Sequence, residues 1–169
     1  LYKCSGFRVW SCFADGAFDC IRHSVEGVEV DTCGHDEHVG DIERAVHTVK
    51  ERMRCLRAGL PYARLPRRVV AALASFGVLW LNAFPCRSGI SSAFSPRTIV
   101  TGTTVSYRLH CRLPFGAYAE VHDNPSPSNL TDVARTTPAL CLGPTGNHRG
   151  TYLSYSLRTG DPSTEVPYN

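Results

Sequence analysis

The sequence lacks closely spaced cysteine pairs, although cysteine itself is plentiful. None of the eight cysteines belongs to a C-x-x-C pair, and they are scattered from Cys4 to Cys141. We therefore expect mostly reduced thiols in a nuclear or cytoplasmic protein, not a secreted one. A signal-peptide pattern is absent as well, and the first residue is Leu1, not Met. We expect a fragment, or a product cut from a longer chain.

Long apolar runs and internal repeats are also missing. The strongest run, Val69–Leu81, is interrupted by Ser75 and followed by Asn82. A membrane-spanning helix needs about 20 predominantly apolar residues. The run therefore predicts a buried helix, and we expect no membrane partner.

Neither sign of charge is in large excess, because the net charge is only +3, but the charges are unevenly placed. Residues 40–68 contain Lys50 and seven arginines against three acids, whereas the first 39 residues contain seven acids against three bases. A basic helix beside an acidic segment is compatible with polyanion binding near a metal site.

The clearest helix signal covers Gly40–Arg57. Apolar residues recur there at steps of four, three, four and three, at Ile42, Val46, Val49, Met53 and Leu56. This is the stripe of an amphipathic helix. Asp41 can cap its first turn, and Gly59 with Pro61 can end it.

A second line on the same helix carries charge. Glu43, His47, Lys50 and Arg54 are spaced four, three and four, so they share one face. One carboxylate followed by three potentially cationic groups could hold a metal at one end and a phosphate backbone along its length. The alternative is an ordinary solvated face with an i,i+4 pair.

Weaker signals place the other elements of the first 105 residues. We expect a strand at Phe7–Phe13, a break at Asp15-Gly16, a short helix at Ala17–Val25 and a short strand at Val28–Val30. A second helix should run from Leu65-Pro66 to about Phe84, before Pro85, and a brief one from Ser95-Pro96 to Gly102.

The amino-acid composition changes near residue 105, where Pro, Gly, Thr and short β-type runs become common. Strands are expected at Ala117–Val121, Ala139–Leu142 and Thr151–Leu157, a loop at Asn124–Asn129, and a hairpin turn at Pro144–Gly150. We interpret this part as a small all-β unit with a barrel-like form.

Two carboxylates are candidates for a shared metal ion. Asp15 follows a predicted strand, and Glu43 lies in the first turn of the central helix. Carboxylates from a strand edge and a neighbouring helix can converge on Mg²⁺, which prefers hard oxygen ligands and assists phosphoryl transfer. The alternative for Asp15 is an ordinary Asp-Gly turn.

A third candidate is the C-x-H-x-x-H segment formed by Cys33, His35 and His38. Zinc accepts these ligand types, but structural zinc sites usually have four ligands and no partner cluster is visible. A Cys-His nucleophile pair is less favoured still, because nothing marks an orienting third group.

Five motifs, in order, resemble the integrase core of Ty1/copia-type retrotransposons and the small domain after it. The central helix reads GDIERAVHTVKERMR, like the family's N-G-x-x-E-R stretch, and Ala14–Phe18 reads ADGAF, a shortened D-N-G-G-E-F. The family's helix ending in L-N-R-x-P-(T/S)-(K/R) is similar to LPRRVVAALASFGVLWLNAFPCRS, and its (S/T)-P-x-E-x-x-x-G is similar to FSPRTIVTG, which lacks the Glu. The SH3-like β-domain is similar to FGAYAEVHD followed by ALCLGPTGNHRGTYLSYSLRTG.

This resemblance implies an α/β fold with a partial RNase H-like integrase core at 1–105 and an SH3-like barrel at 106–169. It implies DNA integration by metal-dependent polynucleotidyl transfer of the D-D-E class, with Mg²⁺ or Mn²⁺ as cofactor. Asp15 and Glu43 take the places of the second and third triad members, as catalytic metal ligands. His47 and Lys50 would face DNA, with Arg54 continuing that face. Element ends and target DNA are the implied partners, and a homo-oligomer is compatible with the family.

The sequence departs from the family in three ways. The first triad Asp has no counterpart, the interval from Asp15 to Glu43 is shorter than usual, and the zinc-binding N-terminal part is absent. We therefore expect this chain to be inactive alone. Two alternatives stay open, a non-catalytic nucleic-acid-binding module and a decayed structural remnant.

Overall fold

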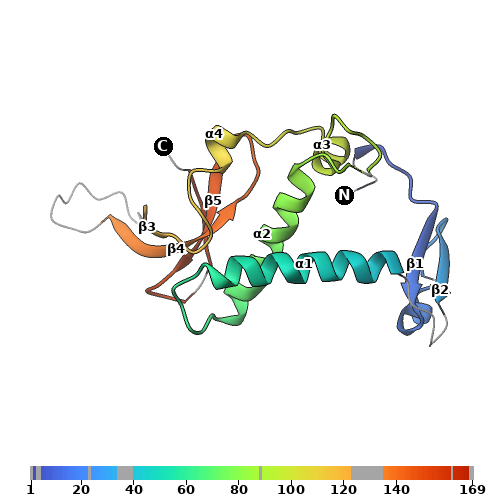
Figure 1. Cartoon of the computed structure of the whole chain (residues 1–169), viewed down its shortest axis with the longest axis horizontal. Coiled ribbons are helices and arrows are strands. Elements are labelled where there is room, and N and C mark those ends of the chain that lie inside the picture. The colour runs from blue at the N-terminus through green and yellow to red at the C-terminus, as the bar shows by residue number, and fades with distance from the viewer. Residues whose placement is uncertain are drawn as a thin grey trace.

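The computed structural model describes residues 2, 5–22, 24–33, 40–87, 89–122, 135–160 and 162–167. These residues form a mixed α/β structure with a two-stranded parallel sheet, a four-stranded antiparallel sheet and helices between them (Figure 1). In chain order the elements are β1 (Ser11–Asp15), η2 (Gly16–Ile21), β2 (Glu29–Cys33), α1 (Gly40–Ala58), α2 (Arg67–Ala83), α3 (Pro96–Thr101), α4 (Tyr107–His110), β3 (Tyr118–His122), β4 (Thr136–Pro144), β5 (Thr151–Ser156) and β6 (Pro162–Pro167).

The predicted central helix is confirmed as α1, but only its second half is packed. Met53 and Leu56 lie against the hydrophobic core, as the apolar stripe predicted. Ile42 and Val46, nearer the start of the same stripe, are 47% and 45% exposed. The apolar stripe therefore predicted the helix correctly, but it did not predict how much of the helix is packed against the rest of the protein.

Helix α2 also follows its prediction closely. Pro66 directly precedes it, and Phe84 is extended, with φ −110° and ψ 146°. The helix ends there because Pro85 disfavours helical backbone in the residue before it. None of the described helices combines the length and the apolar character that a bilayer crossing requires.

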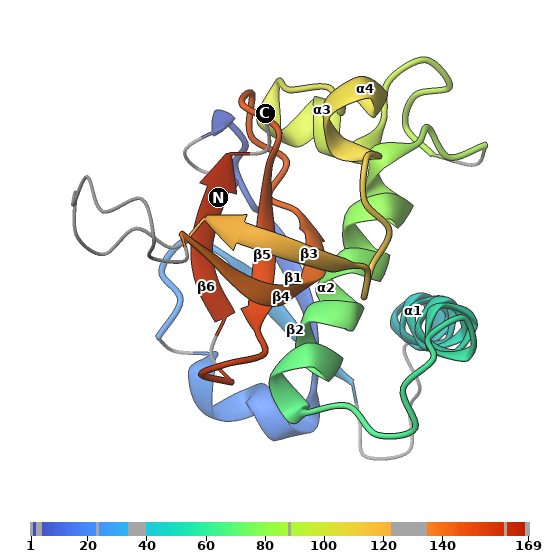
Figure 2. The same cartoon turned by 90° about the vertical axis from the view of Figure 1, so that its left-hand side faces the viewer.

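The hydrophobic core joins α2 to the antiparallel sheet. Val69 and Leu73 of α2 are each 2% exposed and pack with Phe115 and with Leu142 of β4. Viewed along α1, α2 lies between α1 and this sheet (Figure 2). The core thus contains residues from both sides of position 105, and the two-domain division at that position stays a prediction.

The antiparallel sheet has the strand order β3-β4-β5-β6. Among the described strands, β3 and β6 do not pair, so the sheet is open where the sequence suggested a barrel. The predicted hairpin turn is confirmed between β4 and β5, with Gly146 and Gly150 at φ 76° and 67°. Strand β6 was missed because it begins and ends with proline, which is tolerated at strand ends and sheet edges.

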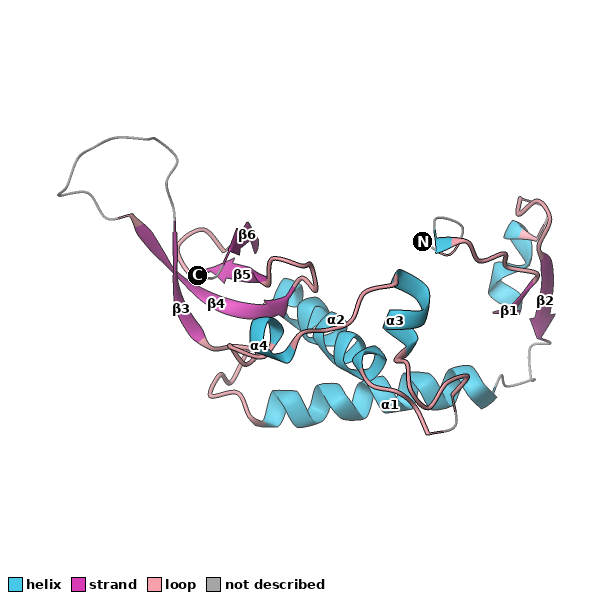
Figure 3. Ribbon diagram, turned by 90° about the horizontal axis from the view of Figure 1, so that it is seen from above, coloured by secondary structure: helices cyan, strands magenta, loops and turns pink. Residues whose placement is uncertain are grey.

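The first two strands form a small unit of their own. β1 and β2 pair in parallel, with Ser11 opposite Glu29 and Asp15 opposite Cys33. Their close contacts are with each other and with η2, and they lie at the opposite end of the molecule from the antiparallel sheet (Figures 1 and 3). The strand expected at Phe7–Phe13 begins later, at Ser11.

Two short helices lead from α2 to the sheet. α3 is confirmed with its predicted cap, since the Ser95 hydroxyl accepts a hydrogen bond from the Thr98 N–H and Gly102 ends the helix at φ 69°. The single turn α4 was not predicted from the sequence. His110 at its end is buried, and its Nε2 lies 2.8 Å from the Asn147 carbonyl oxygen in the β4–β5 turn. This contact ties the helical segment to the sheet.

Candidate nucleic-acid interface

The predicted cationic face of α1 is exposed along its length. The side chains of His47 and Arg54 are 74% and 68% exposed, and Lys50 lies between them on the same face. Long cationic side chains in this position can reach a polyanion without any change of fold.

One acid partly neutralises this face. The Glu51 carboxylate pairs with Arg54 Nη1, and the same oxygen lies 3.9 Å from His47 Nε2. The His47–Glu51 pair is the i,i+4 arrangement expected of a solvated helix face. Lys50 takes no part in these two pairs, so the face keeps cationic character beyond them.

The two predicted metal ligands lie on separate units. Asp15 ends β1, and its Oδ1 accepts a 3.4 Å hydrogen bond from the Ala17 N–H, which is the geometry of an Asp-Gly turn capping η2. Glu43 lies in the first turn of α1, whose main packing partner is α2 and not β1.

Within the described ranges, no three His, Cys, Asp or Glu side chains are grouped so that they could hold a metal. Mg²⁺ or Mn²⁺ at Asp15 and Glu43 stays a prediction of the resemblance. Of the C-x-H-x-x-H segment, His35 and His38 lie outside the described residues, as does the Cys33 side chain.

A stronger feature, which was not predicted above, is an acid-free stretch rich in arginine. Residues 52–119 contain ten arginines and neither Asp nor Glu. The stretch includes the end of α1 and all of α2, α3 and α4. A count of acids along the chain could have found it.

The ten arginines differ in their exposure to solvent. Arg57 and Arg97 are half-buried and serve the fold, since they donate to the carbonyl oxygens of Ala63 (2.6 Å) and Gly146 (2.9 Å). The other eight are exposed: Arg52, Arg54, Arg64, Arg67, Arg68, Arg87, Arg108 and Arg112. Arginine suits phosphate because its planar fork can donate two parallel hydrogen bonds.

Two of these arginines stand where they oppose helix stability. Arg67 and Arg68 are the first two residues of α2, and no acid lies in that turn. The N-terminus of a helix carries partial positive charge, so cations there are unfavourable. An external anion at this end would relieve the repulsion.

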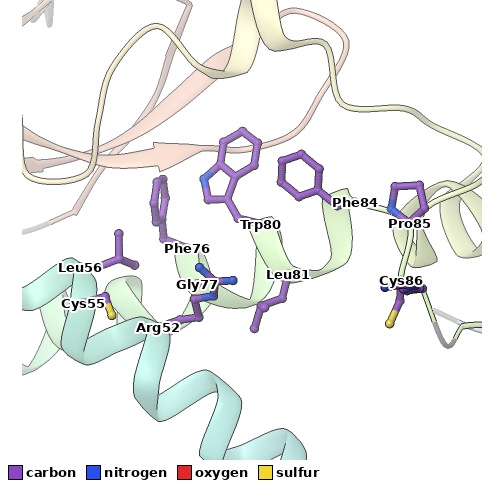
Figure 4. Close-up of a pocket in the computed structure, with 11 residues that line it drawn as sticks. Arg52, Cys55, Leu56, Phe76, Gly77, Trp80, Leu81, Phe84, Pro85 and Cys86 are labelled. Atoms are coloured by element: carbon purple, nitrogen blue, oxygen red, sulfur yellow. The ribbon is translucent and has the colours of Figure 1, made fainter.

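A groove lies between α1 and α2, with a volume of about 710 Å³. The two helices meet at Gly77, where an added Cβ would lie 3.8 Å from Arg52 Cβ. Figure 4 shows the wall of the groove formed by a row of aromatic side chains on α2 and just after it. The groove is lined by Arg52, Cys55, Leu56, Phe76, Gly77, Trp80, Leu81, Phe84, Pro85, Cys86 and Arg87.

The aromatic row runs from the core to the surface. Phe115 in the core lies 5.3 Å from Phe76, ring centroid to centroid, and Phe76 lies 6.0 Å from Trp80. Trp80 is 6.3 Å from Phe84, which lies 6.1 Å from Tyr107. The four-residue spacing of positions 76, 80 and 84 was visible in the sequence, but we interpreted that helix only as buried.

The buried hydroxyl and thiol groups near the core have structural roles. The Tyr152 hydroxyl donates to the Leu109 carbonyl oxygen (3.1 Å) and accepts from the Arg112 N–H (2.9 Å), and burial raises its pKa. Burial also raises the pKa of the Cys141 thiol, which disfavours the thiolate that a cysteine nucleophile needs.

No protein-family model matches this sequence, and no curated protein matches it either. The class of protein thus rests on the motifs of the sequence and on the surface chemistry described above.

Proposed function

We propose that this chain is an integrase-like, nucleic-acid-binding protein that holds DNA on α1 and on the arginines that follow it. We also propose that the chain descends from an RNase H-like integrase core followed by an SH3-like β-domain. The single observation that carries it is the acid-free stretch 52–119 with its eight exposed arginines. Because the stretch itself contains no Asp or Glu, its exposed arginines add to one positive field, which attracts a polyanion and not a neutral partner.

The α1 face extends this field. Lys50 lies just before the acid-free stretch and Arg54 lies within it, and both are exposed on the solvated side of the helix. Binding through such groups releases counterions from DNA, so affinity falls steeply with salt.

The first experiment measures binding of a fluorescent DNA duplex across a series of salt concentrations. Log affinity falls as log salt rises, and the double variant Lys50→Ala/Arg54→Ala should make this slope less steep by about 1 to 2. Arg158→Ala is the matched control, because this exposed arginine lies in the turn between β5 and β6 and should leave the slope unchanged. If the wild type does not bind at about 0.1 M salt, the chain is a structural remnant and the proposal fails.

The second experiment tests the proposed lack of catalysis. An oligonucleotide strand-transfer assay with Mg²⁺ or Mn²⁺ should give no joined product, because the resemblance supplies only Asp15 and Glu43 of three carboxylates. Robust joining that disappears in Glu43→Gln would overturn this part and show that the chain is catalytically active. DNA binding that is indifferent to both Glu43→Gln and Mg²⁺ fits the non-catalytic alternative.

A further inference from the structure

The groove between α1 and α2 differs in chemistry from the cationic face of α1. Arg52 lines the groove, whereas Lys50 and Arg54 belong to the predicted DNA face. Residues two apart on a helix point in different directions. A ligand in the groove would therefore not compete for the side chains of that face.

The wall of the groove is suited to flat rings. Trp80 is half-buried, whereas Phe84 is 48% exposed and also stacks on Tyr107, with 6.1 Å between the ring centroids. Exposed aromatic faces in a row are stacking platforms, and every nucleobase can stack on them. In a duplex the faces of the bases are covered by their neighbours, so such platforms favour unpaired bases.

The spacing of the rings points the same way. The centroids of Phe76, Trp80 and Phe84 are 6.0 and 6.3 Å apart. Successive phosphates of one duplex strand advance by only about 3.4 Å along the axis. A strand that follows this row must be extended and unstacked, which a single strand can do at little cost.

The charges around the groove complement a phosphate backbone. Arg52 and Arg87 are both exposed, and no Asp or Glu is among the residues that line the groove. Guanidinium groups serve a single strand twice, because they pair with phosphates and also stack on bases.

We propose that this groove binds an unpaired segment of nucleic acid, with bases stacked on Trp80 and Phe84 and phosphates held by Arg52 and Arg87. The inference rests on the proposed nucleic-acid binding and gives it a second contact, separate from the α1 face. An acidic peptide is less favoured because the positive field continues beyond the groove, over the other exposed arginines of 52–119. A long polyanion could contact both the groove and these further arginines.

The test uses Trp80 as its own reporter. The chain has two tryptophans, and Trp10→Phe leaves Trp80 as the only one. In that background, an oligothymidylate should quench Trp80 fluorescence and bind more tightly than an abasic oligonucleotide of equal length and charge. Phe84→Leu, an exposed change that should not disturb folding, should weaken oligothymidylate binding about tenfold. The matched control is Val78→Ala, an exposed α2 position outside the groove, which should have no effect.

Three results would overturn the inference. They are equal binding and quenching by the abasic strand, indifference to Phe84→Leu, and quenching by an acidic peptide in preference to the oligothymidylate. If duplex DNA still binds in a salt-dependent way that requires Lys50 and Arg54, only this inference fails. If neither DNA form binds, the proposed function fails with it.

Discussion

Removing one acid from α1 should strengthen DNA binding while slightly weakening the fold. Glu51→Gln keeps the size of the side chain but ends its pairing with Arg54 and His47. The Arg54 guanidinium would then be free of this pairing and could contact phosphate. Exposed helix pairs contribute about 0.3–0.5 kcal/mol each, so the free energy of unfolding should fall by no more than about 1 kcal/mol.

The gain in binding follows from counterion release. One additional phosphate contact steepens the slope of log affinity against log salt by about 0.9. This corresponds to about eightfold tighter binding at 0.1 M salt and to no difference near 1 M salt. Fluorescence anisotropy of a labelled duplex, measured from low to high salt, resolves both the slope and the point of convergence.

A second variant separates a local effect from one of net charge. Glu120→Gln removes the same charge from β3, on the antiparallel sheet, and should change affinity little. If Glu120→Gln strengthens binding as much as Glu51→Gln, only the net charge of the chain matters. If Glu51→Gln weakens binding, then Glu51 orients its partners toward DNA, and the reasoning about competition is refuted.

Three further predictions concern the fold around the proposed interface. Arg67→Glu should raise the free energy of unfolding by about 0.5–1 kcal/mol, because a carboxylate suits the N-terminal end of the α2 dipole, yet it should weaken DNA binding. A loss of stability in urea denaturation together with a loss of DNA affinity would contradict this. Gly143→Ala should cost about 3 kcal/mol in urea denaturation, since Gly143 has φ 115° and an added Cβ would overlap the Phe76 ring, and Phe76→Leu should recover part of that cost. The raised pKa of the Cys141 thiol means that the unfolded chain ionises first, so stability is fully present below the ordinary value of 9.0 and is lost as pH rises above it. Thermal melts of Cys141→Ala should show a smaller alkaline loss than the wild type, and an equal loss would argue against this.

The proposed function places two contacts on one helix pair. The outer face of α1 would hold a duplex by charge, and the groove on its other side would hold unpaired bases by stacking. A nucleic acid with both features, such as a duplex with a single-stranded end, would engage both surfaces. Such a substrate suits the DNA-end chemistry that the resemblance implies.

The sequence by itself determined the helices α1, α2 and α3, because their signals are local. The apolar stripe of α1, the prolines that bracket α2 and the Ser95 cap of α3 act within a few residues of each other. The turn between β4 and β5 was equally local. The four-residue spacing of the aromatic positions 76, 80 and 84 was also visible in the sequence, but the sequence did not show that these side chains are exposed.

Only the tertiary structure decided which surfaces are covered. Ile42 and Val46 carry the same pattern as Met53 and Leu56, but α2 packs against only the second half of α1. β6 exists as an edge because β5 supplies its hydrogen-bond partners. The groove arises where α1 and α2 meet at Gly77, and it is lined by Arg52 and Arg87, which lie far apart in the sequence. These outcomes depend on contacts between distant segments, which no local pattern encodes.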